Sequence, residues 1–404
     1  MQATPSLRDD ARVIGLVGLA HGVSHFFHLI LAALFPWIKV AFALSYAELG
    51  LLMTVFFVVS GVTQALAGFV VDRFGARRVL FGGLALLAVS ALVLSGASSY
   101  AALLGGAMIA GLGNGTFHPA DYTLLNQRVS KPRLAHAFSV HGVTGNLGWA
   151  AAPAFLAGIA SFAGWRVALL SAALIPAAVL ALLWANRTAL RPDPIVHVAA
   201  GAGGTSGSLD FLRLPAVWMS FGFFFLTAVA LGGIQSFASA GLVSLYGMTL
   251  ATATTAYTFY MLASAGGMLL GGFLGARSVH HDRTIAAAFT CAAAMALLLA
   301  AAVVPAWLAV LLMGAIGMAS GIAGPSRDLL IRAAAPKNAT GRVFGVVYSG
   351  LDSGLACGPL LFGALMDAQR PAWIFICIAL FQLLAIGTAV GVGGNSRTPA
   401  LQKA

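Results

Sequence analysis

Long apolar stretches separated by short polar ones fill this chain from end to end. Twelve of them reach about 20 mostly apolar residues, the length an α-helix needs to cross the hydrocarbon core of a membrane. The apolar positions are continuous and do not alternate with polar ones, which argues against membrane-spanning strands. We therefore predict an all-α membrane protein with helices at 13–40, 47–70, 79–97, 101–127, 137–160, 167–185, 217–240, 254–275, 284–303, 306–331, 343–366 and 372–392.

The longest interval between these stretches, residues 186–213, lies near the midpoint of the chain. It is rich in Ala and Gly, which is typical of a flexible linker. The predicted organisation is a six-helix bundle over 1–185, a cytoplasmic linker over 186–213 and a second six-helix bundle over 214–404.

The two sets of six helices share a sequence pattern. Glycines, prolines and one polar position recur in the same order at a constant offset of 206 residues. The matched pairs are 111–115 with 317–321, Pro119 with Pro325, Asn146 with Asp352, Gly148 with Gly354, and Pro153 with Pro359. Such duplication is characteristic of secondary transporters with a substrate site near the bilayer midplane. Because proline lacks a backbone N–H, Pro119 and Pro325 are expected to kink their helices.

Composition narrows the function classes. The chain is 60% apolar and only 8% charged, whereas a soluble domain carries about 25% charged residues. A soluble enzyme and a disordered chain are excluded. The net charge of +11 would suit a nucleic acid partner, but the basic residues are scattered singly between apolar stretches. The three cysteines, Cys291, Cys357 and Cys377, all lie in apolar stretches and predict neither a disulfide framework nor a metal knuckle.

The distribution of positive charge predicts the orientation in the membrane. With the N-terminus in the cytoplasm, 18 of the 22 Lys and Arg residues fall on the cytoplasmic side. Only Lys39, Arg166 and Arg370 fall on the other side, and Arg327 lies within a helix. By the positive-inside rule, both termini are cytoplasmic in a multi-pass protein of an inner membrane. The first apolar stretch continues well past His21 without a cleavage site, so no cleaved signal peptide is expected.

The loop between the second and third predicted helices has a distinctive pattern. Its marked positions are Gly68, Asp72, Arg73, Gly75, Arg77 and Arg78. This loop resembles the signature loop of the major facilitator superfamily, and the twelve helices and duplicated halves extend the resemblance over the whole chain. The resemblance implies a transporter that works by alternating access, with this loop as a gate. Gly68 is expected to let helices approach closely, and Asp72 to pair with an arginine or a helix end.

Within that superfamily, local features resemble the fosmidomycin-resistance group of drug exporters. They are His25-Phe26 in the first helix, residues 113–119 in the fourth, and Asn146, Gly148 and Pro153 in the fifth. The chain departs from that group at His28-Leu29, where the group tends to carry Asn-Asp. This resemblance implies an exporter.

Three histidines in the first helix are the first candidates for proton coupling. His21, His25 and His28 follow i, i+4, i+7 spacing and therefore share one helix face. Ionisable side chains at membrane depth usually face a bundle interior or a wet cavity, and histidine changes charge near neutral pH. Buried structural histidines are the plainer alternative. A metal site would need ligands from other helices, so none is expected.

Polar residues of the fourth and fifth helices form a second candidate group. His118 and Asp121 are three residues apart, and His141 falls at a similar depth. A His118–Asp121–His141 proton relay is therefore predicted, with a structural hydrogen-bond cluster as the alternative.

The second half offers two further candidates. Asp352 lies inside the eleventh helix beside Ser349 and Ser353, among glycines expected to leave room for water. We expect it to couple protons or contact substrate together with Asn146, its partner in the repeat, although a structural pair is possible. Arg327 is a candidate ligand for an anionic group.

These observations predict a proton-coupled secondary transporter that exports a small molecule by alternating access. We expect a monomer in the lipid bilayer, with no cofactor, catalytic residue, metal or nucleic acid partner. A proton symporter importing an anionic metabolite or metal chelate is the main alternative, favoured by the histidines and Arg327. A membrane-embedded enzyme is disfavoured, because no nucleophile faces a partner base.

Overall fold

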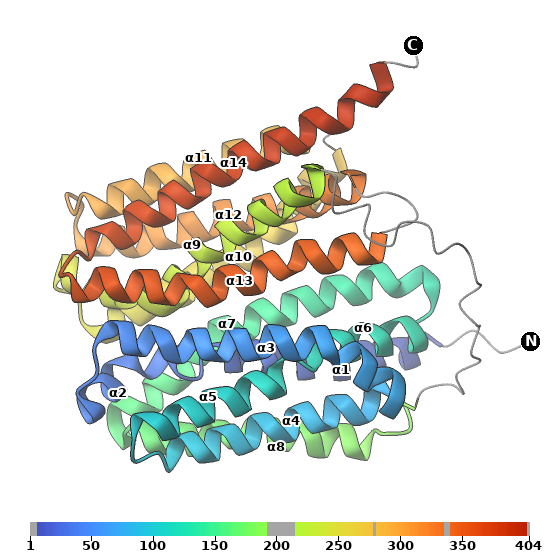
Figure 1. Ribbon diagram of the computed structural model, residues 1–404, viewed down its shortest axis with the longest axis horizontal. Helices are drawn as coiled ribbons and strands as arrows, with labels where there is room; N and C mark the ends of the chain where they lie inside the picture. Colours follow the sequence, from blue (N-terminus) through green and yellow to red (C-terminus); the bar gives the residue numbers. More distant parts are fainter. Residues whose placement is uncertain (1–5, 192–214, 278–279, 335–339, 402–404) are drawn as a thin grey trace, which may run out of the picture. The chain divides into compact units, whose positions relative to one another are not determined.

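The computed structural model describes residues 6–191, 215–277, 280–334 and 340–401 (Figure 1). All regular structure within these residues is helical. The chain divides into two compact units, Met1–Val196 and His197–Ala404. From residue 192 onward, the predicted linker lies outside the described residues.

The first unit contains a helix, or two consecutive helices, for every predicted stretch of the first half. Its helices run alongside one another (Figure 1). They are α1 (Leu7–His28), η1 (Ala32–Leu34), α2 (Phe35–Phe42), α3 (Tyr46–Phe74), α4 (Ala76–Ser95), α5 (Tyr100–Asn114), α6 (Phe117–Arg128), η2 (Lys131–Arg133), α7 (Leu134–Ala163) and α8 (Trp165–Ala185).

The second unit contains one helix for each of the six remaining stretches. They are α9 (Pro215–Tyr246), α10 (Leu250–Arg277), α11 (His281–Ala300), α12 (Ala306–Ala334), α13 (Thr340–Asp367) and α14 (Ala372–Leu401). Over the described parts of both units, nine helices are long and apolar enough to span a membrane, and α1 with the bent segment Ala32–Phe42 makes a tenth.

Two predicted helices are interrupted. The first, predicted over 13–40, ends at His28 and resumes at Ala32 with a bend of 45°. Pro36 explains the change, because its ring excludes a helical hydrogen bond to the carbonyl of Ala32. The fourth is broken between Asn114 and Phe117. There Pro119 cannot donate a hydrogen bond to Gly115.

The prolines of the repeat therefore differ in effect. The break before Pro119 contains Gly115 and Thr116, and the Thr116 hydroxyl donates to the carbonyl of Gly113 at 2.8 Å. In the second unit, α12 continues through Pro325 without interruption. Proline alone is tolerated inside a membrane helix when neighbouring groups replace the lost hydrogen bond.

The repeated glycines have the same packing role in both units. A Cβ on Gly115 would lie 2.5 Å from the backbone oxygen of Ser60 in α3. A Cβ on Gly321 would likewise collide with the backbone oxygen of Ser264 in α10. Membrane helices approach most closely where small residues face each other. The internal repeat thus corresponds to equivalent helix contacts, of α5 with α3 and of α12 with α10.

A second equivalent pair of contacts joins the helices that carry the candidate site residues. A Cβ on Gly148 would collide with the carbonyl oxygen of Gly22, which holds α7 against α1. A Cβ on Gly354 would collide with the carbonyl oxygen of Phe225, which holds α13 against α9. These contacts fix the rotation of α7 and α13, and with it the direction of their polar side chains.

The loop predicted to be a gate, between α3 and α4, has some of the expected contacts and lacks others. Gly68 is exposed, and a Cβ there would meet no described atom of the first unit within 4 Å, so the close helix approach predicted there is not found within this unit. Asp72 is also exposed and is paired with no described residue. Gly75 has φ of +85° between α3 and α4, a conformation that favours glycine. Arg77 donates to the carbonyl of Arg187 after α8 at 2.8 Å.

The remaining arginines of this loop, Arg73 and Arg78, are exposed. The Arg73 guanidinium lies 5.5 Å from the centre of the Phe74 ring. The loop therefore presents a basic surface at this end of the first unit.

Candidate functional site

The first unit gathers five histidines around one buried carboxylate. His21, His25 and His28 come from α1, His118 from α6 and His141 from α7. The i, i+4, i+7 spacing places the α1 rings next to one another, with ring centres 4.3 Å apart for His21 and His25 and 4.8 Å for His25 and His28. We call these five residues and Asp121 the histidine cluster.

Asp121 of α6 joins two of the histidines. Its Oδ2 atom lies 3.4 Å from His21 Nδ1 and 3.2 Å from His141 Nε2, and the residue is fully buried. The His21 and His141 rings are stacked, with centres 3.4 Å apart. The carboxylate therefore ties α6 to both α1 and α7.

His118 does not occupy the place predicted for it in a relay. Its Nδ1 atom lies 2.7 Å from Oε1 of Gln64 in α3. The partner of Asp121 besides His141 is His21, which the prediction assigned only to the α1 face. Side chains three residues apart on one helix need not contact the same partner, because each contacts the neighbouring helix that it faces.

His25 and His28 pack against α7. A Cβ on Gly145 would lie 2.7 Å from the His25 ring, so glycine leaves the space for that imidazole. Both ring nitrogens of His25 are buried and have no hydrogen-bond partner among the described residues. The indole N–H of Trp149 donates to Nδ1 of His28 at 3.2 Å.

A neutral network extends the cluster to α5. The Ser24 hydroxyl donates to Oδ1 of Asn114 at 2.5 Å, and Nδ2 of Asn114 donates to the Ser60 hydroxyl at 2.8 Å. Gln64, Trp149 and this network were not singled out as site residues from the sequence. They are neutral or aromatic residues spread over α1, α3, α5 and α7, so no charged motif marks them in the sequence.

Asn146 and Asp352, the matched pair of the repeat, lie on equivalent helices. Asn146 is buried on α7 and donates to the carbonyl of Gly142 at 3.3 Å. Asp352 is partly buried on α13. The expectation that glycines beside Asp352 leave room for water is wrong for Gly350 and Gly354, because both face backbone oxygens of α9.

Arg327 of α12 packs on an aromatic ring of its own unit. Its guanidinium carbon lies 4.7 Å from the centre of the Phe224 ring of α9, a cation–π distance. The side chain of the adjacent Asp328 lies outside the described residues.

The second unit also holds buried polar atoms that have no hydrogen-bond partner among the described residues. They belong to Gln235 and Ser236 of α9, Tyr257 and Thr258 of α10, His281 of α11, Ser326 of α12 and Gln382 of α14. No motif marks these residues in the sequence, because they are scattered in apolar helices. Buried polar groups are normally paired, so these atoms are available to a polar ligand.

Comparison with known proteins completes the identification. Residues 17–350 and 242–399 match the model of the Major Facilitator Superfamily. The chain belongs to this superfamily. It is therefore a multi-pass membrane protein of this superfamily, and the all-α fold predicted from the apolar stretches is confirmed.

Curated relatives are distant and match in part. The fosmidomycin resistance protein of Escherichia coli (strain K12) is 24% identical over 151 residues, 37% of each chain. The membrane sensor protein UhpC of Salmonella typhimurium is 27% identical over 285 residues, 64% of this chain and 61% of that protein. This chain thus spans less than two thirds of these relatives. The predicted weak resemblance to the fosmidomycin-resistance group is confirmed.

Solved structures support the superfamily fold. A bacterial homologue of the human lysosomal transporter Spinster, in an inward-facing and occupied conformation, has a TM-score of 0.78 at 14% identity, with 96% of this chain and 98% of that chain covered. Its inward-facing, unoccupied form has a TM-score of 0.71 at 15% identity, with 97% of each chain covered. At this identity the likeness concerns the fold alone.

Proposed function

We propose that this major facilitator transporter is a proton-coupled exporter of a small molecule, with both termini in the cytoplasm of a cell bounded by an inner membrane. The observation that carries the coupling is the position of Asp352. It lies 12 residues into the 28-residue helix α13, about 18 Å from the helix start at 1.5 Å per residue. A carboxylate at that depth is costly in a membrane helix and is a functional candidate for that reason.

The coupling follows from the charge of this side chain. Protonation neutralises Asp352 and removes the cost of holding a charge inside the bundle. The free-energy difference between two facing states then depends on whether the proton is bound, which is what alternating access requires of a coupling residue. A matched control exists on the same helix, because Asp367 is an exposed acid at the end of α13.

Export is the proposed direction because one relative is named for resistance to a drug, fosmidomycin. The charge distribution supports the proposed orientation, with 18 basic residues on the side assigned to the cytoplasm. Import of an anionic metabolite by proton symport is the second candidate, and the observation that favours it is the Arg327 guanidinium among the helices of the second unit.

The sign of the proton movement tests the direction. Everted membrane vesicles are energised by respiration, and a pH-sensitive acridine dye reports the acid lumen. Fosmidomycin is added outside as the first probe. An antiporter carries it inward as protons leave, so dye fluorescence recovers. Further quenching would show that protons enter with the substrate and would contradict export. A vesicle lacking the protein is the control.

A further inference from the structure

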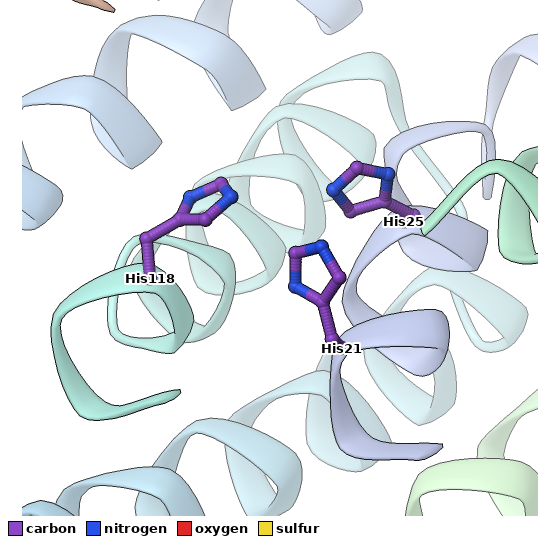
Figure 2. Close-up of side chains that lie close together, drawn as sticks. All are labelled: His21, His25 and His118. Carbon is purple, nitrogen blue, oxygen red and sulfur yellow. The ribbon is translucent and has the colours of Figure 1, made fainter. Parts of the chain in front are cut away.

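The histidine cluster contains three imidazoles whose nitrogens converge (Figure 2). One ring nitrogen from each of His21, His25 and His118 lies within 4.8 Å of the others. We propose that these three residues bind a divalent transition-metal ion of the zinc class. This proposal does not depend on the direction or proton coupling proposed above.

The orientation of the rings supports a shared ion. The lone pair of an imidazole nitrogen lies in the ring plane, so ligands of one ion need planes that intersect. The planes of His21 and His25 meet at 54°, those of His21 and His118 at 61°, and those of His25 and His118 at 77°. The ring centres are 4.3, 5.2 and 6.2 Å apart. Imidazoles around a tetrahedral ion with 2.0–2.1 Å bonds have centres about 5 Å apart.

A hydrogen bond directs one ring nitrogen toward the ion. His118 Nδ1 lies 2.7 Å from the Gln64 amide oxygen, whereas His21 Nδ1 lies 3.4 Å from the Asp121 carboxylate, an ion-pair distance without a hydrogen bond. Donation of Nδ1–H to an oxygen leaves the lone pair on Nε2. Histidine ligands of metals are held in this way by a carboxylate or carbonyl on the opposite nitrogen. His118 would therefore bind through Nε2. For His21, the nearby Asp121 carboxylate favours a proton on Nδ1 and leaves Nε2 for the ion.

His25 supplies the third ligand. Both of its ring nitrogens are buried without a hydrogen-bond partner in the part of the chain that the structure describes, and only 9% of the residue is exposed. A buried polar atom without a partner is costly, and metal ligation would remove that cost. The fully buried Asp121 next to His21 adds a negative charge that favours a cation here.

A competing set, His21, Asp121 and His141, also lies within 4.8 Å. It suits an ion less well. The His21 and His141 rings are stacked at 21°, so their planes are close to parallel and their lone pairs do not converge well. In addition, Asp121 already accepts from His141 at 3.2 Å.

The ligand set defines the class of ion. Three imidazoles and no thiolate suit Zn²⁺, Co²⁺, Ni²⁺ or Cu²⁺, whereas Mg²⁺ and Ca²⁺ prefer oxygen ligands. Three protein ligands leave a fourth tetrahedral position for water or for a donor atom of a transported molecule.

Cobalt provides a direct test on the full chain. Untagged protein in detergent is stripped with a chelator and titrated with Co²⁺, whose visible ligand-field bands report the ligands and geometry. We expect saturable binding of one ion with the strong bands of a four- or five-coordinate site, displacement by Zn²⁺, and no competition by Mg²⁺.

Variants locate the site. Side chains that contact a ligand histidine contribute about 10–100-fold in affinity, and loss of a ligand itself costs more. His25→Gln and His118→Gln should each weaken Co²⁺ binding more than about 100-fold, and Asp121→Asn by about 10–100-fold. His136→Gln is the matched control and should leave the affinity unchanged, because His136 is exposed at the start of α7.

Circular dichroism and gel filtration establish that each variant is folded, and His25→Ala replaces His25→Gln if that variant aggregates. No saturable binding, or equal affinity in the wild type and both ligand variants, would overturn the proposal.

Discussion

Asp121 of α6 lies 3.4 Å from His21 of α1, through Oδ2 and Nδ1, in a fully buried contact between two helices about 100 residues apart in the chain. The same carboxylate oxygen lies 3.2 Å from His141. One acidic side chain thus holds three helices of the first unit together, and its loss should weaken the packing of all three.

Replacing Asp121 with Asn tests this role. Asn keeps the shape but loses the charge, and its amide nitrogen cannot accept from a histidine. Hydrogen bonds to charged groups contribute about 1.5–3 kcal/mol, so we expect a loss of stability of that order. The measurement is the apparent Tm in detergent. Asp72→Asn is the control, since Asp72 is exposed. Equal Tm values for the two variants would contradict a stabilising role.

The packing of α7 on α1 predicts that alanine substitutions at two glycines of α7 will change stability differently. Gly148→Ala places a Cβ against the carbonyl oxygen of Gly22, whereas Gly158→Ala meets no atom within 4 Å. Overpacking typically costs about 1–3 kcal/mol. Gly148→Ala should therefore lower the apparent Tm, and Gly158→Ala should leave it unchanged or raise it slightly. If the two substitutions behave alike, the close contact does not limit stability.

Asp10 links the first turn of α1 to the segment between α6 and α7. It is fully buried, accepts from the Ser130 hydroxyl and backbone N–H, and pairs with Arg133 at 2.7 Å. Asp10→Asn should therefore destabilise the first unit by about 1–3 kcal/mol. Asp9→Asn is the matched control, because Asp9 is an exposed neighbour. Protease cleavage of this segment in membranes would measure local opening, and an unchanged cleavage rate in Asp10→Asn would argue against the link.

Asp352 predicts a separation of two transport modes. If its protonation couples the gradient to transport, Asp352→Asn should abolish gradient-driven accumulation in vesicles while substrate counterflow, which needs no net proton movement, continues. Asp367→Asn should retain both. Loss of counterflow as well, in a folded Asp352→Asn protein, would instead identify Asp352 as a direct substrate ligand. Retention of accumulation would remove Asp352 from the coupling mechanism.

The apolar stretches alone predicted where the helices lie. Each predicted stretch has a helix or a helix pair, because a membrane accepts only segments that are long, apolar and internally hydrogen-bonded. The exceptions are local: Pro36 and the segment before Pro119 interrupt two helices. The repeat was also readable, since glycines such as Gly115 and Gly321 must be small wherever a neighbouring backbone lies against them.

Which residues form the candidate site depended on the tertiary structure. Spacing showed that His21 and His25 share a face, but only the packing of α6 on α1 brought His118 beside them and turned Asp121 toward His21. No metal site was expected from the sequence, because spacing along one helix does not locate ligands on another. The rotation of each helix is set by backbone contacts such as Gly148 on Gly22, which carry no charge or spacing signal. Hydrophobicity therefore determined the helices, and close packing decided which polar side chains meet.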